Sequence, residues 1–426
     1  MQYNIVFWVI VAIVVVEFVW DQILTALNRS RMSDHLPPEL VGIYEPDEYA
    51  RQQQYQRANS RLHMVSSSAD KLFLLAVLFV GGAGWLDTLI RRTVTPQPVL
   101  QAVLFFAAIT ILTTLISLPF SYYDTFVIEE RFGFNKSSRG LFFADTAKSL
   151  VLGLVLTSLI VGVVAWLYYL IPGWFWLLAW AVMVFISVGI GYFYSTLIVP
   201  LFNKQTPLEE GPLRDRLFKL GEQAGFQIQD IYVMDGSKRS TKANAYFTGF
   251  GRRKRIVLYD TLIDDLEPEE IAAVLAHEIG HYKKHHMWLG MALGAAQTGL
   301  MMWLMSLFLG NVMMAQALGA TLPSFHIGMA AFMLVYAPVS ELLAVGESAW
   351  SRRHEYQADT FAVRLNLGSQ LMSGLKKISA KALSNLTPHP LVVFWEYSHP
   401  TLLQRMQNVS LEEANRAESS GGLLSR

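Results

Sequence analysis

The stretch that decides the fold covers residues 268–310 and reads PEEIAAVLAHEIGHYKKHHMWLGMALGAAQTGLMMWLMSLFLG. Its first part has the composition of a helix and contains two histidines four residues apart, His277 and His281. Its second part, from Met287 onward, is apolar over at least the ~20 residues that cross a bilayer as a helix. The stretch therefore predicts a metal-binding helix that leads directly into a membrane-spanning helix.

The composition of the whole chain agrees with a membrane protein. Of its 426 residues, 53% are hydrophobic and only 16% are charged, against roughly 25% charged in soluble proteins. The 34 basic and 34 acidic residues cancel, so the total charge gives no reason to expect a nucleic-acid partner. The chain has no cysteine, which excludes disulfides, thiolate nucleophiles and cysteine-based zinc sites. Histidines and carboxylates would have to hold any metal.

Six other apolar runs approach the length of a membrane span. The predicted spans are residues 5–20, 72–90, 99–120, 150–171, 174–199, 287–310 and 326–349. The first has no basic residue ahead of it and no small-residue cleavage site behind it, so we expect it to be retained and not removed as a signal peptide. We predict a predominantly α-helical integral membrane protein with seven transmembrane helices.

Lysine and arginine are distributed unevenly over the segments between the spans. They gather after the first span, after the third span and at the start of the C-terminal segment, whereas the connections 172–173 and 311–325 contain none. Because basic residues favour the cytoplasmic side, we expect the N-terminus outside and the long polar segments in the cytoplasm. Arg91 and Arg92 are the one contrary pair.

The largest polar insertion, residues 200–286, is predicted to contain a small sheet. It reads as a helix over 212–224, followed by strands over 228–234, 243–247 and 255–259. The metal-binding helix then begins after Asp265, with Pro268 suited to its first position.

The histidine pair is suited to zinc. On an α-helix, residues four apart lie about 40° apart around the axis and ~6 Å apart along it, so His277 and His281 can direct both imidazoles to one ion. Glu278 lies about 100° round the helix from His277, where it can reach a zinc-bound water without being a ligand. Zinc lowers the pKa of such a water to roughly 7, and a carboxylate can take its proton during attack on a carbonyl. The same short motif also arises by chance on exposed helices.

A catalytic zinc needs a third protein ligand. His285 lies ~12 Å along the helix axis from His277 and cannot converge with it on one ion, so His285 and His286 read as a solvated or interfacial helix end. Glu355 is the stronger candidate, because Glu355 and Asp359 share a helix face, as suits a ligand and a carboxylate that orients a ligating histidine. Spacing alone slightly favours the alternative, a solvated face beside a basic membrane anchor.

Six motifs occur in order over most of the chain. They are TFVIEERFGFN (125–135), PLFNKQTPL (200–208), DGSKRSTKANAYFTGFGRRKRIVLYDTL (235–262), HEIGH (277–281), SRRHEYQADTFA (351–362) and YSHPTLL (397–403). Together these motifs resemble the integral-membrane zinc CAAX prenyl proteases of the type I family. The set is far more specific than HEIGH alone.

The resemblance implies an active site with one catalytic Zn²⁺. Its implied zinc ligands are His277, His281 and Glu355. Glu278 would activate the water, and Asp359 matches a supporting carboxylate, sometimes described as a proton donor. His399 matches a histidine near the metal that could stabilise the oxyanion. An edge strand, along which an extended substrate could lie by strand addition, matches Asn244, Ala245, Tyr246 and Phe247.

The resemblance also implies the architecture, seven helices around an intramembrane chamber that a zincin-like α+β catalytic domain closes. Glu17, Glu341 and Glu347 lie in or near apolar spans, as suits a wet interior; the alternative for them is hydrogen bonding at helix ends or between helices. We divide the chain into a membrane region with five spans and an amphipathic cytoplasmic loop (1–199), a catalytic domain (200–286), two further spans (287–350), a C-terminal catalytic segment (351–413) and a flexible tail (414–426).

The expected activity is that of a zinc metalloendopeptidase on a peptide or protein substrate, prenylated or membrane-embedded, with C-terminal CAAX-type processing by resemblance. The sequence departs from the family at Thr241 and Lys242, and its C-terminus has no obvious ER-retrieval signal. We expect a bacterial inner membrane, or the ER membrane in a eukaryote. Two alternatives stay open, a quality-control protease for membrane proteins and a zinc-regulated channel or transporter.

Overall fold

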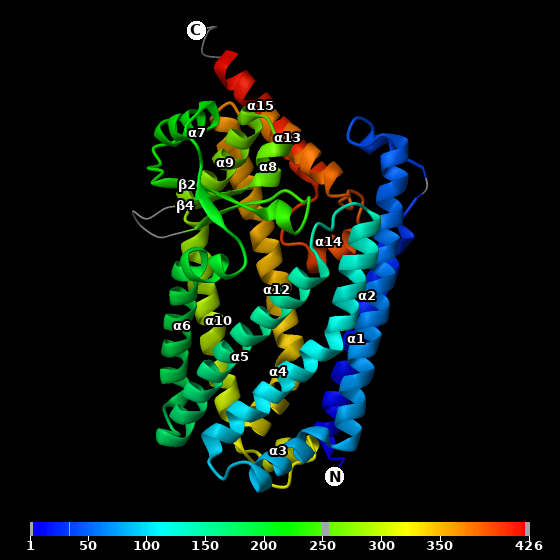
Figure 1. Ribbon diagram of the computed structural model, residues 1–426, viewed down its shortest axis with the longest axis vertical. Helices are drawn as coiled ribbons and strands as arrows, with labels where there is room; N and C mark the ends of the chain where they lie inside the picture. Colours follow the sequence, from blue (N-terminus) through cyan, green and yellow to red (C-terminus); the bar gives the residue numbers. More distant parts are fainter. Residues whose placement is uncertain (1–2, 34, 249–254, 422–426) are drawn as a thin grey trace.

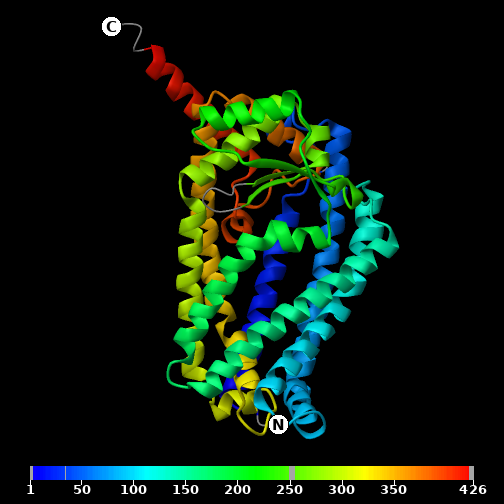
Figure 2. The ribbon, with the colours of Figure 1, turned by 60° about the vertical axis from the view of Figure 1, so that its left-hand side comes forward.

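The computed structural model describes residues 3–33, 35–248 and 255–421. Long helices run along the molecule, and a small sheet with shorter helices covers one end of them (Figure 1 and Figure 2). The N-terminus lies at the opposite end of the long helices from the sheet (Figure 1). This arrangement agrees with the predicted topology, in which the N-terminus and the polar segment 200–286 lie on opposite sides of a membrane.

Seven helices within the described residues are long and apolar enough to cross a membrane. They are α1 (Ile5–Ser30), α2 (Pro46–Val80), α4 (Pro98–Tyr123) extended by η2 (Asp124–Glu129), α5 (Arg139–Leu170), α6 (Phe175–Phe193) extended by η3 (Tyr194–Ile198) and η4 (Val199–Leu201), α10 (His286–Phe308) and α12 (Phe325–Arg364). In each helix we consider the apolar stretch of 18 residues that would cross the membrane. Only 6% to 28% of the residues in these stretches are buried. Such extensive exposed apolar surface marks contact with lipid, and the predicted fold class is confirmed.

The second span lies earlier in the chain than predicted. The expected span over 72–90 is interrupted at Gly81, which has a left-handed backbone (φ 69°) and ends α2. Glycine adopts this conformation without steric cost and commonly terminates helices. The chain continues in a separate helix, α3 (Gly82–Thr93), whose last turn carries Arg91 and Arg92. The apolar run therefore belongs to two helices, and α2 reaches back to Pro46 to complete its span.

The last span is longer than predicted. α12 continues for 40 residues without a break, whereas the sequence suggested a span over 326–349 followed by a separate catalytic segment. At 1.5 Å per residue the helix is about 60 Å long. One rigid element thus connects the membrane region to Glu355 and Asp359.

Four short strands form a mixed sheet. They are β1 (Gln205–Pro207), β2 (Asp230–Met234), β3 (Ala245–Thr248) and β4 (Arg255–Tyr259), in the spatial order β1-β2-β4-β3. β2 and β4 are parallel, and the other two pairs are antiparallel. The strands predicted over 228–234, 243–247 and 255–259 correspond to β2, β3 and β4, and β1 was not predicted.

Shorter helices complete the fold, most of them at the end that carries the sheet (Figure 1). They are α7 (Pro212–Gln223), α8 (Asp260–Asp265), α9 (Pro268–Lys283), α13 (Gly368–Lys381), α14 (Pro390–Glu396) and α15 (Leu402–Gly421), with the minor elements η1 (Pro38–Leu40), η5 (Gly236–Lys238) and α11 (Val312–Ala317). A capping box between Glu267 and Glu270 starts α9, with Pro268 at its first position as predicted. Within the tail predicted to be flexible, α15 is still helical as far as Gly421.

The core of this region lies between the sheet, α7, α9, α12 and α13. Buried apolar side chains that build it include Leu220 of α7, Leu258 of β4, Ile271 and Leu275 of α9, and Leu371 of α13. α9 contributes a nearly continuous buried face, so its position relative to α12 is tightly fixed.

α3 lies at the end of the spans that is farther from the sheet (Figure 1). The amide of Gly84 donates to the carbonyl oxygen of Leu318 at 2.9 Å. Asp87 is buried and contacts the buried His326 of α12 at 2.8 Å and Arg91 at 2.9 Å. These contacts fix α3 against the loop that precedes α12.

Replacing Gly84 by alanine is expected to destabilise the protein by about 1–3 kcal/mol, because the added methyl group would overlap the backbone of Gly319. The thermal unfolding midpoint of the detergent-solubilised protein measures the effect. Gly153→Ala in α5 is the matched control, since nothing lies within 4 Å of its added methyl group and alanine favours a helix. Equal midpoints for the two variants would contradict the close packing of α3.

Candidate metal centre

The metal-binding motif lies on α9, which packs against α12 at Gly280. A Cβ atom added to Gly280 would lie only 3.0 Å from the Cα atom of Ala358, so the missing side chain lets the two helices approach closely. His277 and His281 lie one turn apart on α9, and Glu355 lies on the adjoining turn of α12. Glycine within the motif therefore brings the third candidate ligand within reach of the histidines.

The three predicted ligands converge. His277 Nε2 lies 3.1 Å from His281 Nε2 and 3.4 Å from Glu355 Oε2, and His281 Nε2 lies 3.2 Å from Glu355 Oε1. Tetrahedral ligands at zinc bonding distance lie about 3.3 Å from one another. Within the described residues, Glu355 Oε2 is buried without a hydrogen-bond partner, and Arg405 Nη1 lies 3.5 Å from it as an ion-pair partner. An oxygen with no hydrogen bond is costly to bury, so it is well suited to a metal ion. Two imidazoles and one carboxylate in this geometry fit a catalytic zinc centre.

A buried carboxylate and a buried arginine support His277. Its Nδ1 atom lies 2.8 Å from Asp359 Oδ1, so Nδ1–H donates to Asp359 and Nε2 faces the metal position. Arg405 holds both oxygens of Asp359, with Nη2 2.6 Å from Oδ1 and Nε 3.0 Å from Oδ2. Burial by itself lowers the pKa of His277, but the carboxylates of Asp359 and Glu355 outweigh burial and raise this pKa to about 9. The surroundings thus favour positive charge at the metal position.

Sequence reasoning missed Arg405. It is buried on α15 together with Leu402 and Val409, which lie three residues before it and four residues after it. An arginine on the apolar face of an amphipathic helix indicates a buried acidic partner. This signal is present in the sequence, but it does not identify Asp359 as the partner.

An imidazole supports the second histidine ligand. His286 is buried; its Nδ1 lies 3.0 Å from His281 Nδ1 and its Nε2 lies 3.0 Å from Gln357 Oε1. A neutral imidazole has one donor and one acceptor nitrogen, so donation to Gln357 leaves Nδ1 of His286 to accept from His281. The ring also stacks on His354 at 3.8 Å. The predicted solvated helix end is therefore wrong for His286, whereas His285 is exposed.

His399 lies beside a candidate ligand, and Glu278 follows a candidate ligand, His277, in the chain. Glu278 is half-buried, and its carboxylate forms no hydrogen bond or ion pair with the residues that the structure describes. The side chain of His399 is 63% exposed, and its Nε2 lies 3.4 Å from Glu355 Oε1. Its Nδ1 lies 2.9 Å from Ser398 Oγ. The structure thus brings His399 beside a candidate ligand and leaves Glu278 without a competing partner, while the chemical roles of both stay predictions.

The strand predicted to bind substrate forms one edge of the sheet. β3 pairs only with β4 among the described strands. Asn244, just before the strand, is exposed, and its Oδ1 accepts from the amide of Ala245 at 2.8 Å. The hydroxyl of Tyr246 accepts from Gln205 Nε2 at 3.2 Å. The side chain of Phe247 lies outside the described residues.

Two side chains, Lys242 and Gln205, tie this edge to the membrane spans. Lys242 Nζ lies 2.9 Å from a carboxylate oxygen of Glu129 on η2 and 2.8 Å from the hydroxyl of Tyr55 on α2. Gln205 Nε2, which reaches Tyr246, also donates to Ser195 Oγ on η3 at 3.3 Å. The departure from the family at Lys242 therefore lies at an anchor of the edge strand.

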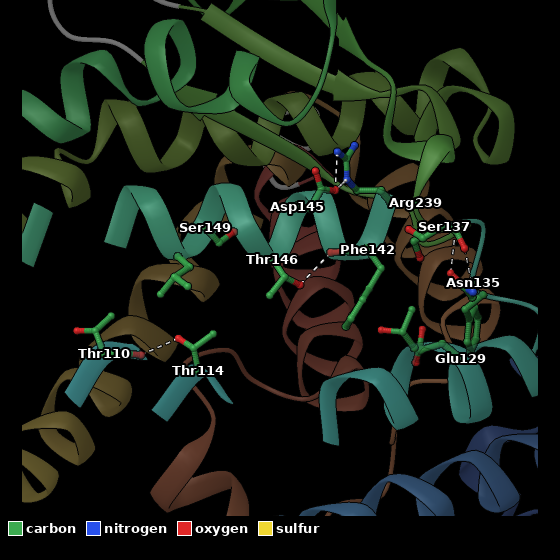
Figure 3. Close-up of a pocket in the computed structure, with 14 residues that line it drawn as sticks. Thr110, Thr114, Glu129, Asn135, Ser137, Phe142, Asp145, Thr146, Ser149 and Arg239 are labelled. Atoms are coloured by element: carbon green, nitrogen blue, oxygen red, sulfur yellow. Dashed lines mark hydrogen bonds and ion pairs between the residues drawn. The ribbon is translucent and has the colours of Figure 1, made fainter. Parts of the chain in front are cut away.

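A polar cavity of about 510 Å³ lies between α4, α5 and the turn that precedes β3 (Figure 3). Thr110 and Thr114 of α4 and Thr146 of α5 contribute hydroxyl groups to its lining. At its upper side in this view, Arg239 pairs with Asp145 at 2.8 Å (Figure 3). The lining also carries the charged side chains of Glu129, Asp145 and Arg239. Charged groups at spans face wet interiors or protein in preference to lipid, so the sides of α4 and α5 that line the cavity are the inner ones.

Two of the glutamates in the spans have partners on neighbouring helices. Glu17 of α1 pairs with Lys71 of α2 at 3.1 Å, and Glu341 of α12 accepts from Trp395 Nε1 of α14 at 2.8 Å. Both carboxylates thus contact a neighbouring helix, in agreement with hydrogen bonding between helices, while Glu17 Oε1 is buried without a hydrogen-bond partner among the described residues. The intramembrane chamber stays a prediction.

Replacing His286 by alanine is expected to weaken zinc binding by about 10- to 100-fold, because His281 would lose the group that fixes its tautomer and ring orientation. Competition with a chelator of known zinc affinity measures the change. His285→Asn is the matched control, because His285 is the exposed neighbour and asparagine tolerates its left-handed backbone (φ 59°). If both variants bind zinc as tightly as the unmodified protein, the supporting role of His286 is wrong.

Comparison with known proteins adds independent evidence on the family. Residues 26–204 match the N-terminal domain of CAAX prenyl proteases, described as five membrane helices, and residues 207–413 match peptidase family M48. The chain is 32% identical to the CAAX prenyl protease 1 homolog of Arabidopsis thaliana, over 95% of this chain and 97% of that protein. It is also 32% identical to CAAX prenyl protease 1 of Saccharomyces cerevisiae, over 92% of each chain.

A solved structure has the same fold. The crystal structure of S. mikatae Ste24p matches 96% of this chain and 100% of that chain with a TM-score of 0.90 and 30% identity. These relatives are eukaryotic, so the comparisons do not support the bacterial origin expected from the sequence. The match to a peptidase family also favours an enzyme over the channel or transporter alternative. With zinc ligands His277, His281 and Glu355 in place, the chain belongs to the CAAX prenyl protease 1 family, membrane zinc metalloproteases of peptidase family M48.

Proposed function

We propose that this protein removes C-terminal peptides from prenylated proteins by zinc-dependent hydrolysis. The convergence of His277, His281 and Glu355 beside Glu278, at the end of the membrane spans, carries this proposal. The substrate class comes from relatives that are CAAX prenyl proteases. A zinc ion held by the three ligands would supply a Lewis acid that lowers the pKa of a water and polarises the scissile carbonyl.

Glu278 is the proposed general base. Its carboxylate follows a ligand directly in the chain and is not engaged by another described side chain, so it can accept a proton from the attacking water. The same group then carries the proton to the leaving amine, because one positioned carboxylate can act as base and afterwards as acid.

Asp359 is better suited to positioning than to proton donation. It is fully buried, one oxygen accepts from His277, and both oxygens accept from Arg405. An ionised carboxylate held by two such donors has no proton to give and is shielded from the substrate. Its proposed role is to hold His277 in the tautomer that presents Nε2 to the metal.

His399 is the proposed stabiliser of the oxyanion. It lies beside Glu355 with its ring largely exposed, so it faces the open side of the centre and not the protein interior. An imidazole N–H aimed at the carbonyl oxygen would stabilise the negative charge that develops there during attack.

The free edge of β3 is the proposed substrate guide. An extended peptide can add to an unpaired sheet edge through main-chain hydrogen bonds, while its side chains fill alternate positions. The strand begins at Ala245, directly after Asn244, and the contact between Lys242 and Glu129 holds this region against η2. We therefore propose that residues 200–286 and 351–413 share the catalytic machinery and that the membrane region 1–199 supports it. The positive-inside pattern of the sequence favours a cytoplasmic orientation for this end.

Replacing Glu278 by glutamine is expected to leave one zinc per protein and to reduce peptide cleavage by at least about 100-fold, because the amide cannot accept the proton of water. Elemental analysis and a fluorogenic peptide assay give the two readouts. Glu269→Gln is the matched control on the same helix, since Glu269 is exposed and pairs with Arg216 instead. Cleavage at the control rate by the Glu278 variant would disprove the assigned base.

Substrate class is tested with two peptides of one sequence, one carrying a farnesyl group on its CAAX cysteine and one unmodified. A prenyl-dependent processor is expected to cleave the farnesylated peptide with a kcat/KM at least about 10-fold higher, because an added apolar group contributes binding free energy. Equal cleavage of both peptides, together with degradation of an unfolded membrane protein, would favour the quality-control alternative.

A further inference from the structure

A second groove, of about 440 Å³, lies between α2, the end of α4 and η2. Its walls are mostly apolar and include Val65 of α2, Tyr123 of α4 and Val127 of η2. All three side chains are substantially exposed, at 60%, 48% and 43%. An exposed apolar groove of this size on a membrane protein calls for an occupant.

The groove lies on the opposite face of α4 from the polar cavity of Figure 3. Thr110 and Thr114 line that cavity, whereas Pro119 and Tyr123 line the groove. Each groove residue comes nine positions after its counterpart, which corresponds to half a turn around the helix. Since charged side chains line the polar cavity and mark that side of α4 as the inner one, the groove faces outward, toward lipid.

The position of Arg61 places the groove at one boundary of the bilayer. Arg61 lines the groove, and α2 ends nineteen residues later at Val80. That separation is about 29 Å along a helix, and the hydrocarbon core of a bilayer is about 30 Å thick. The groove therefore opens at headgroup level, on the same side as the sheet.

The only charged residues in the lining are two arginines, Arg61 and Arg131. Both are exposed, and neither forms an ion pair with a carboxylate in the described part of the chain. Arg131 lies with its guanidinium 5.5 Å from the ring centre of Phe132. The groove thus combines an apolar floor with two unpaired positive charges, and an occupant must satisfy both.

We propose that this groove binds an anionic phospholipid. An acyl chain would cover the apolar wall, and the phosphate would pair with Arg61 and Arg131, because guanidinium groups bind phosphate oxygens through forked hydrogen bonds. A prenyl chain would fill the apolar wall but leave both arginines unpaired. Charge complementarity therefore selects the phospholipid.

The bound lipid would also brace η2. Val127 and Ile128 contribute to the groove, and Glu129, the next residue, anchors Lys242 ahead of the edge strand. Lipid at this position would therefore stabilise the segment that supports the substrate strand.

The test titrates the delipidated full-length protein in detergent with dioleoylphosphatidylglycerol and counts bound lipids by native mass spectrometry. The double variant Arg61→Gln and Arg131→Gln is expected to bind about 25-fold more weakly, at about fivefold per arginine near a membrane surface. Val65→Trp, which fills the groove and keeps both charges, is expected to reduce binding comparably. Arg139→Gln is the matched control, an exposed arginine at the start of α5 that does not line the groove, and it should bind like the unmodified protein.

Three outcomes would overturn the proposal. The first is unchanged lipid binding in the double variant, and the second is an equal loss in Arg139→Gln, which would indicate attraction by charge alone. The third is displacement of the lipid by a farnesylated peptide that binds the double variant as well as the unmodified protein, which would make the groove a substrate-tail site. Thermal unfolding midpoints of all variants show that any loss of binding is not a loss of folding.

Discussion

The contact between α9 and α12 at Gly280 is the constraint on which the metal centre depends. Two of the zinc ligands come from α9 and the third from α12, so the distance between the helices sets whether the three atoms can share one ion. A side chain at Gly280 would press on Ala358, one turn from Glu355, and α12 would have to give by a few tenths of an ångström, about the tolerance of a zinc–ligand distance. Because α12 runs from the last span to Glu355 without a break, one continuous helix links the metal centre to the membrane region.

The second condition for the metal centre is that positive charges balance the two buried carboxylates of α12. Glu355 and Asp359 are both buried on one face of α12, and two carboxylates at this spacing repel each other unless cations intervene. Arg405 supplies one positive charge from α15, and the zinc ion is suited to supply the other. Removing one partner from a buried set of charges costs more than the set contributes as a whole. The C-terminal helix is therefore part of the active centre, although it lies far from the motif helix in sequence.

Much of the fold and part of the metal centre could be predicted from local sequence, because membrane spans and metal motifs are local patterns. Apolar length predicted seven spans, and four-residue spacing predicted that His277 and His281 share a face of one helix. Sequence-based prediction fails where the structure depends on the backbone conformation of one residue or on contacts between residues far apart in the chain. Gly81 divides an apolar run that hydropathy alone reads as one span. Spacing could not decide between a ligand and a solvated face for Glu355, because its partners lie about 80 residues away on α9.

The edge strand shows how membrane helices reach the catalytic site. α4 and α6 each end in a π-helical turn, η2 and η3, and such turns shift the side-chain register of a helix and recur at functional sites. From η2, Glu129 contacts Lys242, while from η3, Ser195 reaches Tyr246 through Gln205. Two spans therefore hold β3 from two directions, ahead of the strand and along it. Because these contacts come from the membrane helices and not from the core of the sheet, movement of either span would shift the strand relative to the metal.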